Sequence, residues 1–166
     1  MSDQKFNSFD EMAMQLALLE AKKAFLENEV PVGAVLSLQN KIISFGYNKV
    51  HGLKDSSLHA EMICLRSAAK ILGDFRLTDC VLYSTLEPCA MCAGAIFNFR
   101  VKKVIWGAKD LRVGACGTLY NLFDGSHPIH TVESIGGLME EESADLLKMF
   151  FKNKRAEKKC SSCLKN

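Results

Sequence analysis

Two short segments carry residues whose types and spacing suit metal chemistry. The first reads "HAE" at residues 59–61, and the second reads "PCAMC" at residues 88–92. Side chains three apart on a helix share one face, with Cβ atoms roughly 5–6 Å apart, so both thiols of the second segment can bind one ion. Thiolates combined with an imidazole favour zinc. The predicted zinc ligands are therefore His59, Cys89 and Cys92.

Glu61 differs from these three residues in its position. It follows His59 by two residues, a spacing that turns the two side chains in different directions on a helix. We therefore expect Glu61 beside a water on the ion and not on the ion itself. Three protein ligands with one open position are typical of catalytic zinc, whereas structural zinc has four protein ligands. Two thiolates cancel the formal charge of the ion, so its water needs a carboxylate to take the proton, and Glu61 is the predicted catalytic residue.

Other interpretations of the same residues remain open. Cys-x-x-Cys alone suits thioredoxin-like redox chemistry, which leaves His59 and Glu61 without a role. A lone histidine at the start of a helix is more often a capping residue or a core packing residue than a metal ligand. A structural zinc site needs a fourth ligand, for which Cys64 and Cys116 are candidates. These two and Cys80 stand in apolar segments, so we expect them to be buried as small hydrophobic residues.

Helices and strands must bring the two segments together. Periodic apolar residues predict four helices, over residues 8–29, 58–72, 86–96 and from about residue 138 onward. The first opens with a predicted capping box, Ser8 with Glu11, and the second closes at Gly73. Apolar and β-branched runs predict four strands, two of them within residues 30–48 and the others within 79–86 and 101–108. Gln39-Asn40 joins the first two strands as a hairpin, and residues 49–57 and 107–118 form loops.

This order of elements predicts an α/β fold, a mixed sheet covered by helices on both faces. The hairpin makes its two strands antiparallel, whereas strand-helix-strand units make the later pairs parallel. The helices that carry His59 and Cys89 each follow a strand. Both helices should therefore begin at the same edge of the sheet, which is where such folds place their functional sites.

Composition and length exclude several classes of protein. At 166 residues and 48% hydrophobic, the chain suits one globular domain, which we expect to span residues 1–156. No apolar run reaches the roughly 18 residues of a membrane helix, and "MSDQKFNSFDEM" is too polar for a signal peptide. Seven cysteines without an export signal indicate a reducing compartment, so we expect a cytoplasmic protein with no membrane partner.

The charge is distributed unevenly along the chain. Residues 148–166 carry seven Lys or Arg against one acid, whereas residues 1–147 carry fourteen basic and eighteen acidic groups. A basic end on an acidic body favours a polyanionic partner, first of all nucleic acid, although a solvated terminal helix is the plainer interpretation. We expect residues 157–166 to be a disordered basic tail, with Cys160 and Cys163 as free thiols and not a second metal site.

Taken together, H-x-E and P-C-x-x-C resemble the signature of the zinc deaminases, in which the Glu is an acid/base and not a ligand. The wider sequence resembles the bacterial tRNA-specific adenosine deaminases from about residue 8 to residue 156. The matching segments are "VPVGAV" (30–35), Gly46-x-Asn48, "HAEM" (59–62), "LEPCAMCAGAI" (86–96), "GAKD" with "GACGTLYNL" (107–122) and Phe150-Phe151.

The resemblance implies a cytidine deaminase-like fold, with three α-β-α layers and a mixed five-stranded sheet. It also implies one Zn²⁺ per subunit and a homodimer whose active sites form near the subunit interface. Four residues would bind the substrate. Asn48 would hydrogen-bond the purine, the base would lie against Val32, Asp110 would accept from a ribose 2′-hydroxyl, and Phe151 would complete the set.

The implied reaction is hydrolytic deamination of the wobble adenosine in a tRNA anticodon loop, which gives inosine and ammonia. A deaminase of free guanine or cytidine is the alternative, because the metal residues are shared among these enzymes. Asp110 and the basic terminal segment favour RNA, since a free base needs neither a ribose contact nor neutralised phosphates. A zinc module that only binds RNA, without catalysis, is a third hypothesis.

Overall fold

The computed structural model describes residues 5–125 and 129–163, with side chains described as far as Lys159. Within these residues one sheet has the strand order β2-β1-β3-β4-β5. The strands are β1 (Gly33–Leu38), β2 (Lys41–Tyr47), β3 (Cys80–Leu86), β4 (Lys103–Ala108) and β5 (Glu133–Gly136). β1 pairs antiparallel with β2 and β3, whereas β3, β4 and β5 are parallel. The expected mixed five-stranded sheet is confirmed.

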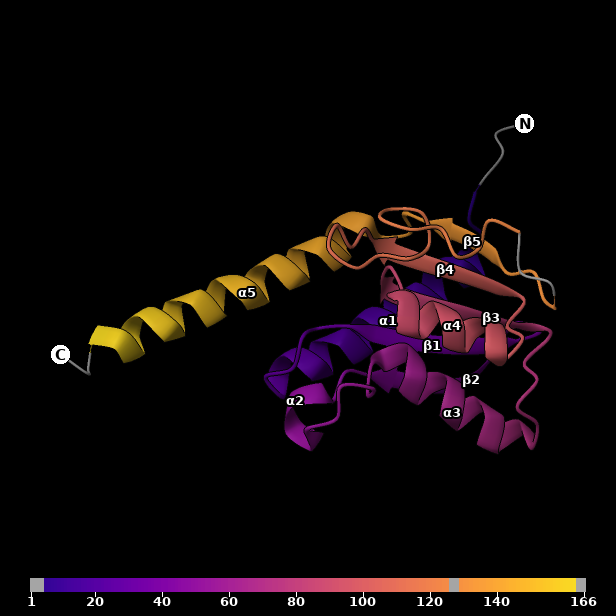
Figure 1. Ribbon diagram of the computed structural model, residues 1–166, viewed down its shortest axis with the longest axis horizontal. Coiled ribbons are helices and arrows are strands. Elements are labelled where there is room, and N and C mark those ends of the chain that lie inside the picture. Colours follow the sequence, from indigo (N-terminus) through magenta and orange to yellow (C-terminus); the bar gives the residue numbers. More distant parts are fainter. Residues whose placement is uncertain (1–4, 126–128, 164–166) are drawn as a thin grey trace.

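Helices cover both faces of this sheet, as Figure 1 shows. They are α1 (Ser8–Leu26), α2 (Val50–Leu53), α3 (Ala60–Leu72), α4 (Ala90–Asn98) and α5 (Glu140–Cys163). α3 and α4 lie over one face, and α1 with the first part of α5 lies over the other. The three-layer arrangement predicted from the order of elements is therefore correct. No helix among the described residues is long and apolar enough to cross a membrane.

The central strands are buried on both faces, so their sequences are almost continuously apolar. Successive side chains of a strand point to opposite faces. Leu82 and Val104 pack in the core under α3 and α4. Tyr83 and Ile105 pack in the second core, under α1. Two separate cores thus fix the sheet between its helices.

The capping box of α1 lies one residue earlier than predicted. Asn7, and not Ser8, is the N-cap, and its Oδ1 accepts hydrogen bonds from the N–H groups of Phe9 (2.8 Å) and Asp10 (3.0 Å). Asp10 completes the box by accepting from the N–H of Asn7 at 3.0 Å. The Tyr83 hydroxyl also donates to Asp10, at 2.8 Å. This buried contact with β3 explains why the carboxylate of Asp10 closes the box and that of Glu11 does not.

The end of the chain also differs from the prediction. α5 continues through Cys163, so residues 157–163 are helical where we expected disorder, and residues 164–166 lie outside the described part. An ion pair between Lys154 and Glu157 (3.2 Å) links successive turns of the helix. Its C-terminal part extends away from the sheet (Figure 1). The predicted state of Cys160 and Cys163 concerns side chains outside the described residues.

Two short elements were not found from sequence patterns. α2 lies within the predicted loop 49–57, and β5 has only four residues, of which Gly136 pairs with Trp106. The hairpin prediction is confirmed. Gln39 and Asn40 have φ angles of 50° and 55°, as a two-residue turn between twisted strands requires.

α3 approaches β2 most closely at Gly46. A Cβ atom there would contact the carbonyl oxygen of Ala60 and lie 2.8 Å from the backbone nitrogen of Cys64. Only glycine allows this approach, because every other residue carries that atom. The absence of a side chain at Gly46 therefore sets the position of the first turn of α3, next to His59.

We predict that Gly46→Ala lowers the free energy of unfolding by about 1–3 kcal/mol, since the added methyl group overpacks this contact. Gly94→Ala in α4 is the matched control, because a Cβ atom at Gly94 meets nothing within 4 Å. It should leave stability unchanged or raise it by up to about 1 kcal/mol through helix propensity. Urea unfolding of the three proteins measures both effects. Equal midpoints for Gly46→Ala and the unsubstituted protein would contradict the prediction.

Candidate active site

The two segments with metal chemistry meet at one edge of the sheet. β2 and β3 both run antiparallel to β1, so they end at the same edge. α3 follows β2 and has His59 as its N-cap, and α4 follows β3 and has Cys89 as its N-cap. The predicted juxtaposition of the two helix starts is confirmed, and the shared direction of β2 and β3 is one condition for it.

His59, Cys89 and Cys92 form a cluster that can hold a metal ion. Their ligand atoms all lie within 4.8 Å of one another. The Nδ1 atom of His59 lies 3.6 Å from Cys89 Sγ and 3.5 Å from Cys92 Sγ. Two sulfurs and one imidazole nitrogen are the donor set that zinc prefers. The side chains therefore fit this ion by type and by geometry.

Neither candidate for a fourth ligand belongs to the cluster. Cys64 lies 3.2 Å from the hydroxyl of Ser44, and the Cys116 thiol donates to the carbonyl of Pro88 at 3.7 Å. Both thiols are buried, and so is Cys80, as expected. Burial raises the pKa of Cys64 to about 12. Among the described residues, the cluster of His, Cys and acidic side chains has three members, which is the number that leaves a catalytic position open.

The two thiols of the cluster differ in their acidity. The hydrogen bond from the Cys92 thiol, helped by His59, lowers the pKa of Cys89 to about 4. The same hydrogen bond and burial raise the pKa of Cys92. The hydrogen bond to Cys89 in turn raises the pKa of His59. Cys89 is thus a thiolate at neutral pH, at the start of a helix whose dipole favours negative charge.

Glu61 lies beside the cluster with an unsatisfied oxygen. Its side chain is 3% exposed, and its Oε2 atom has no hydrogen-bond partner. Burial raises the pKa of this carboxyl group above its ordinary value. A carboxylate whose pKa is raised is a stronger base than a free one, which suits a group that accepts a proton in acid/base catalysis.

A cavity of about 200 Å³ opens in front of the cluster. It is lined by Val30, Val32, Asn48, Val50, His51, His59, Glu61, Leu86, Glu87, Cys89, Asp110, Arg112 and Val113. The structure therefore gathers three predicted substrate-binding residues here, Val32, Asn48 and Asp110. Phe151 does not line this cavity. It lines an adjoining groove, which shares Leu86, Asp110 and Arg112 with the cavity.

Asn48 and Asp110 both support the backbone around the cavity. The N–H of Ala60 donates to Asn48 Oδ1 at 2.9 Å, which satisfies one of the donors at the start of α3. Asp110 Oδ1 accepts from the N–H groups of Arg112 (2.9 Å) and Val113 (3.3 Å). In each side chain one polar atom is used for structure, and the other terminal atom remains for a ligand.

Sequence reasoning missed several residues that hold or line the site. Glu29 and Glu87 are buried carboxylates whose partners are backbone N–H groups. Arg112 lies over the ring of Phe151, with its guanidinium carbon 5.6 Å from the ring centre. The one sequence signal for both acids is their place next to apolar runs and proline, in "NEVPVGAV" and "LEPC".

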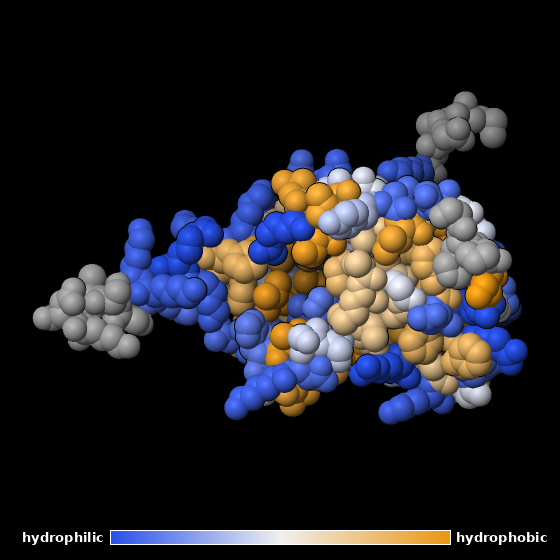
Figure 2. Space-filling model, in the orientation of Figure 1, coloured by the Kyte–Doolittle hydropathy of each residue, from blue (hydrophilic) through white to orange (hydrophobic). Residues whose placement is uncertain are grey.

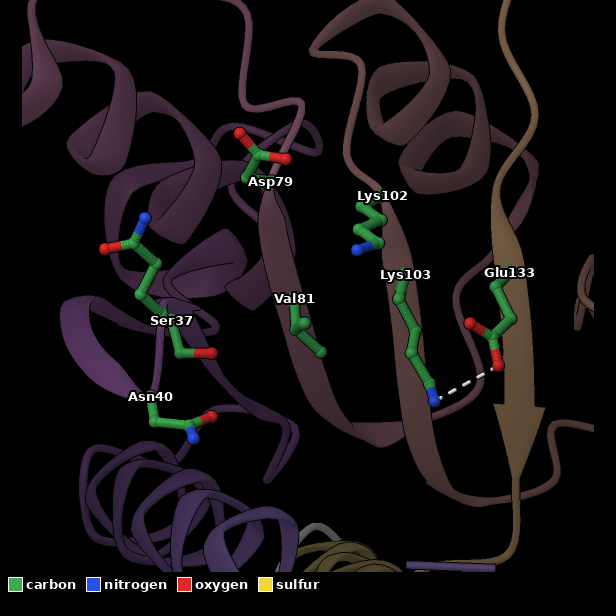
Figure 3. Close-up of a pocket in the computed structure, with 8 residues that line it drawn as sticks. Ser37, Asn40, Asp79, Val81, Lys102, Lys103 and Glu133 are labelled. Atoms are coloured by element: carbon green, nitrogen blue, oxygen red, sulfur yellow. Dashed lines mark ion pairs between the residues drawn. The ribbon is translucent and has the colours of Figure 1, made fainter.

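The opposite edge of the sheet holds a second hollow of about 530 Å³, shown in Figure 3. It is lined by Ser37, Gln39, Asn40, Asp79, Val81, Lys102, Lys103 and Glu133. Lys103 and Glu133 form an ion pair at 3.1 Å, drawn as a dashed line in the figure. Neither histidine nor cysteine lines this hollow, so the residues suited to zinc lie at the other edge.

Comparison with known proteins agrees with this geometry. The family described as "Cytidine and deoxycytidylate deaminase zinc-binding region" matches residues 7–108, which include the whole metal cluster. A protein of Haemophilus influenzae named tRNA-specific adenosine deaminase is 43% identical over 95% of this chain and 92% of its own length. The chloroplastic tRNA(adenine(34)) deaminase of Arabidopsis thaliana is 47% identical over 86% of this chain, which spans only 12% of that protein.

Solved structures show the same relation. A structure from a study of A-to-I editing by tRNA:A34 deaminases at the wobble position superimposes with a TM-score of 0.78. It is 41% identical, and the match covers 82% of this chain and 99% of that one. The matched family region, the five-stranded sheet and the His-Cys-Cys group of possible metal ligands agree with one another. The chain therefore belongs to the cytidine and deoxycytidylate deaminase family, and the relatives it resembles include proteins named tRNA-specific adenosine deaminase.

Proposed function

We propose that this protein is a zinc-dependent adenosine deaminase that converts the wobble adenosine of a tRNA anticodon loop to inosine. One observation carries the proposal. The unpaired Oε2 of buried Glu61 lies beside a three-membered cluster of imidazole and thiols, in a cavity of about 200 Å³. The names of relatives similar over almost their whole length support RNA as the substrate.

His59, Cys89 and Cys92 would hold one zinc ion per subunit. When bound, zinc supplies a Lewis acid that lowers the pKa of a coordinated water molecule. The thiolate of Cys89 and the imidazole of His59 would hold the ion near Glu61, because both residues start helices that the sheet holds in place. These ligands need a reducing compartment, which supports a cytoplasmic location.

Glu61 moves the protons of the reaction. It takes a proton from water as the water oxygen forms a bond to C6 of the adenine ring. The carboxyl group then donates this proton to the ring nitrogen. It next takes the proton of the new C6 hydroxyl and gives it to the amino group, so the C6–N bond breaks, the C6 carbonyl forms and ammonia leaves. Water and adenosine thus give inosine and ammonia. The raised pKa of Glu61 suits a group that must accept and then return a proton.

Asn48, Val32 and Asp110 position the nucleoside. The cavity is suited to one base and not to a stacked helix, so the adenosine must leave the stack of the loop to enter. The remaining amide nitrogen of Asn48 donates to a ring nitrogen of adenine, and Val32 offers an apolar surface to the ring. The free carboxylate oxygen of Asp110 accepts from a 2′-hydroxyl, the group that distinguishes RNA from DNA.

The nucleotides of the anticodon loop that flank the adenosine would bind in the adjoining groove. Its lining includes Lys109, Arg112, Lys148, Arg155 and the ring of Phe151. Cations of this kind neutralise phosphates, and an aromatic ring stacks on a splayed base. A free nucleobase would use the cavity without the groove, so these residues favour RNA over free guanine or cytidine.

We further propose that the protein is a homodimer. Figure 2 shows apolar residues gathered over α4 and the segment that follows β4. The exposed apolar and aromatic side chains of α4 and of this segment include Met91, Leu119, Tyr120 and Leu122. Contiguous apolar surface of this kind usually marks a protein interface. The face adjoins the metal cluster through α4, so a second copy of the chain would cover the surface next to the active site.

Glu61→Gln should reduce inosine formation by at least about 10³-fold, because it removes the group that accepts the proton from water. Zinc content should stay at one ion per chain. Ammonia release and metal analysis of the same preparation test the two statements together. If the variant loses zinc, Glu61 is a ligand and its assigned role is wrong.

Cys92→Ala should lose zinc and activity together, since the cluster then has only two ligands. Cys80→Ala is the control, because Cys80 is equally buried but starts β3, at the far edge of the sheet. That variant should keep one zinc per chain. Removing the metal with a chelator should abolish activity of the unsubstituted protein, and added zinc should restore it. Full activity of zinc-free protein would contradict the proposed function.

Binding of an anticodon stem-loop should weaken steeply with salt. Replacing Lys148 and Arg155 together with alanine should reduce the slope of log K against log salt by roughly 1.4–1.8, about 0.7–0.9 for each lost phosphate contact. Lys41→Ala, at the opposite edge of the sheet, should leave the slope unchanged. Filter binding at several salt concentrations measures the slopes. Identical slopes for all variants would show that the groove does not bind phosphates.

A further inference from the structure

Glu87 is a buried carboxylate to which the mechanism gives no part. It is 2% exposed, and within the described part of the chain no ion pair neutralises it. Instead, its oxygens accept three backbone hydrogen bonds. The N–H groups of Cys116 and Thr118 donate to Oε1 at 3.0 Å each, and that of Asp110 donates to Oε2 at 3.2 Å. Such bonds to a charged acceptor are stronger than those between neutral groups.

The loop after β4 therefore wraps around this one side chain. Gly114 lies so close that an added Cβ atom would be 2.6 Å from Cδ of Glu87. The N–H of Ala115 donates to the carbonyl of Pro88 at 2.9 Å, and Cys89 forms an isolated β-bridge with Gly114. The loop is thus attached at Glu87 to the segment that carries a metal ligand.

This attachment sets one wall of the substrate cavity. Asp110, Arg112 and Val113 of the same loop line the cavity, together with Glu87 itself. The hydrogen bond between the Asp110 N–H and Glu87 joins the backbone of the proposed sugar-binding residue to the residue two before Cys89. Glu87 therefore helps to fix the distance between the proposed 2′-hydroxyl acceptor and the three proposed zinc ligands.

We propose that Glu87 is a positioning residue that determines selectivity for ribose at the active site. The inference rests on the proposed function, in which Asp110 accepts a hydrogen bond from a 2′-hydroxyl. Without the carboxylate, the N–H groups it satisfies lose their partner and the loop moves. Asp110 then no longer holds the sugar at the right distance, whereas Glu61 and the zinc ligands stay in place.

Glu29 provides a matched comparison. It is also 2% exposed, and its carboxylate accepts from the N–H groups of His51 (3.0 Å) and Gly52 (2.6 Å). It thereby anchors α2, from which Val50 and His51 line the same cavity. Glu29 and Glu87 are therefore both buried carboxylates that hold the backbone of a cavity wall. Glu29 holds the wall formed by α2, and Glu87 holds the wall that contains Asp110.

The test compares Glu87→Gln with Glu29→Gln. Each substitution keeps the size of the side chain but replaces one acceptor oxygen by an amino group. Substrates are an anticodon stem-loop and a set of copies, each with one 2′-deoxynucleotide at or beside the target adenosine. The unsubstituted enzyme should prefer ribose at one of these positions, and Asp110→Asn should remove that preference.

Glu87→Gln should also lose most of the preference for ribose. The main change should be a KM for the all-ribose substrate that is about tenfold higher, because one hydrogen bond to the substrate is lost. Its kcat should fall less than threefold, and its zinc content should stay at one ion per chain. Glu29→Gln should keep the preference. The double variant Glu87→Gln/Asp110→Asn should have the same ribose preference as Asp110→Asn alone, because both substitutions act on one contact.

Two results would overturn the inference while the proposed function stands. In one, Glu87→Gln deaminates the stem-loop with unchanged ribose preference; in the other, Glu29→Gln loses as much preference as Glu87→Gln. Release of ammonia from free guanine but not from the stem-loop would overturn the proposed function, and the inference with it. If Glu87→Gln does not fold, Gly114→Ala disturbs the same contact from the loop side and must show the same loss of preference.

Discussion

Everything at the site depends on the meeting of two helix starts at one edge of the sheet. His59 and Cys89 are both N-cap residues, and their ligand atoms lie 3.6 Å apart although thirty positions separate them in the chain. Three conditions produce this meeting. β2 and β3 must run in the same direction, α3 must approach β2 at Gly46, and α4 must begin directly after β3. Each condition belongs to the sheet and its packing and not to the metal, so the scaffold itself brings the ligands together.

Three buried glutamates in or behind the walls of the cavity, Glu29, Glu61 and Glu87, are in two different states. Glu29 and Glu87 are fully engaged by backbone N–H groups, whereas Glu61 keeps one oxygen without a partner. A buried polar atom without a hydrogen bond costs roughly 1–3 kcal/mol, so the fold tolerates this state only where other interactions offset it. The contrast separates the carboxylates that shape the walls from the one that is left to react.

Sequence reasoning found what is encoded locally. Within each segment the spacing is short, two residues from His59 to Glu61 and three from Cys89 to Cys92, and the rules of strand direction then place both segments at one edge. The role of Glu87 is not local, because its partners are backbone N–H groups 23 to 31 residues away and any residue type supplies such a donor. Its charge and burial alone do not reveal what it binds.

Other differences have equally specific causes. In "NSFDE" both Asn7 and Ser8 can cap a helix, and the tertiary contact of Asp10 with Tyr83 decides between them. The composition of residues 157–163 suggested disorder, but the helix continues there with the Lys154–Glu157 pair at its base. β5 carries too few residues for a pattern, and its pairing with β4 defines it.

The projecting part of α5 separates the charges of the molecule in space. Residues 1–147 carry an excess of acids, and the excess of bases lies on residues 148–166, most of them on the helix that leaves the sheet (Figure 1). From Lys148 to Cys163 a helix spans about 24 Å at 1.5 Å per residue, roughly three times the screening length of about 8 Å in physiological salt. A polyanion therefore feels attraction at one end and repulsion at the other before any contact forms. The molecule therefore behaves as an electric dipole, and its field turns an approaching polyanion toward the projecting part of α5 before contact.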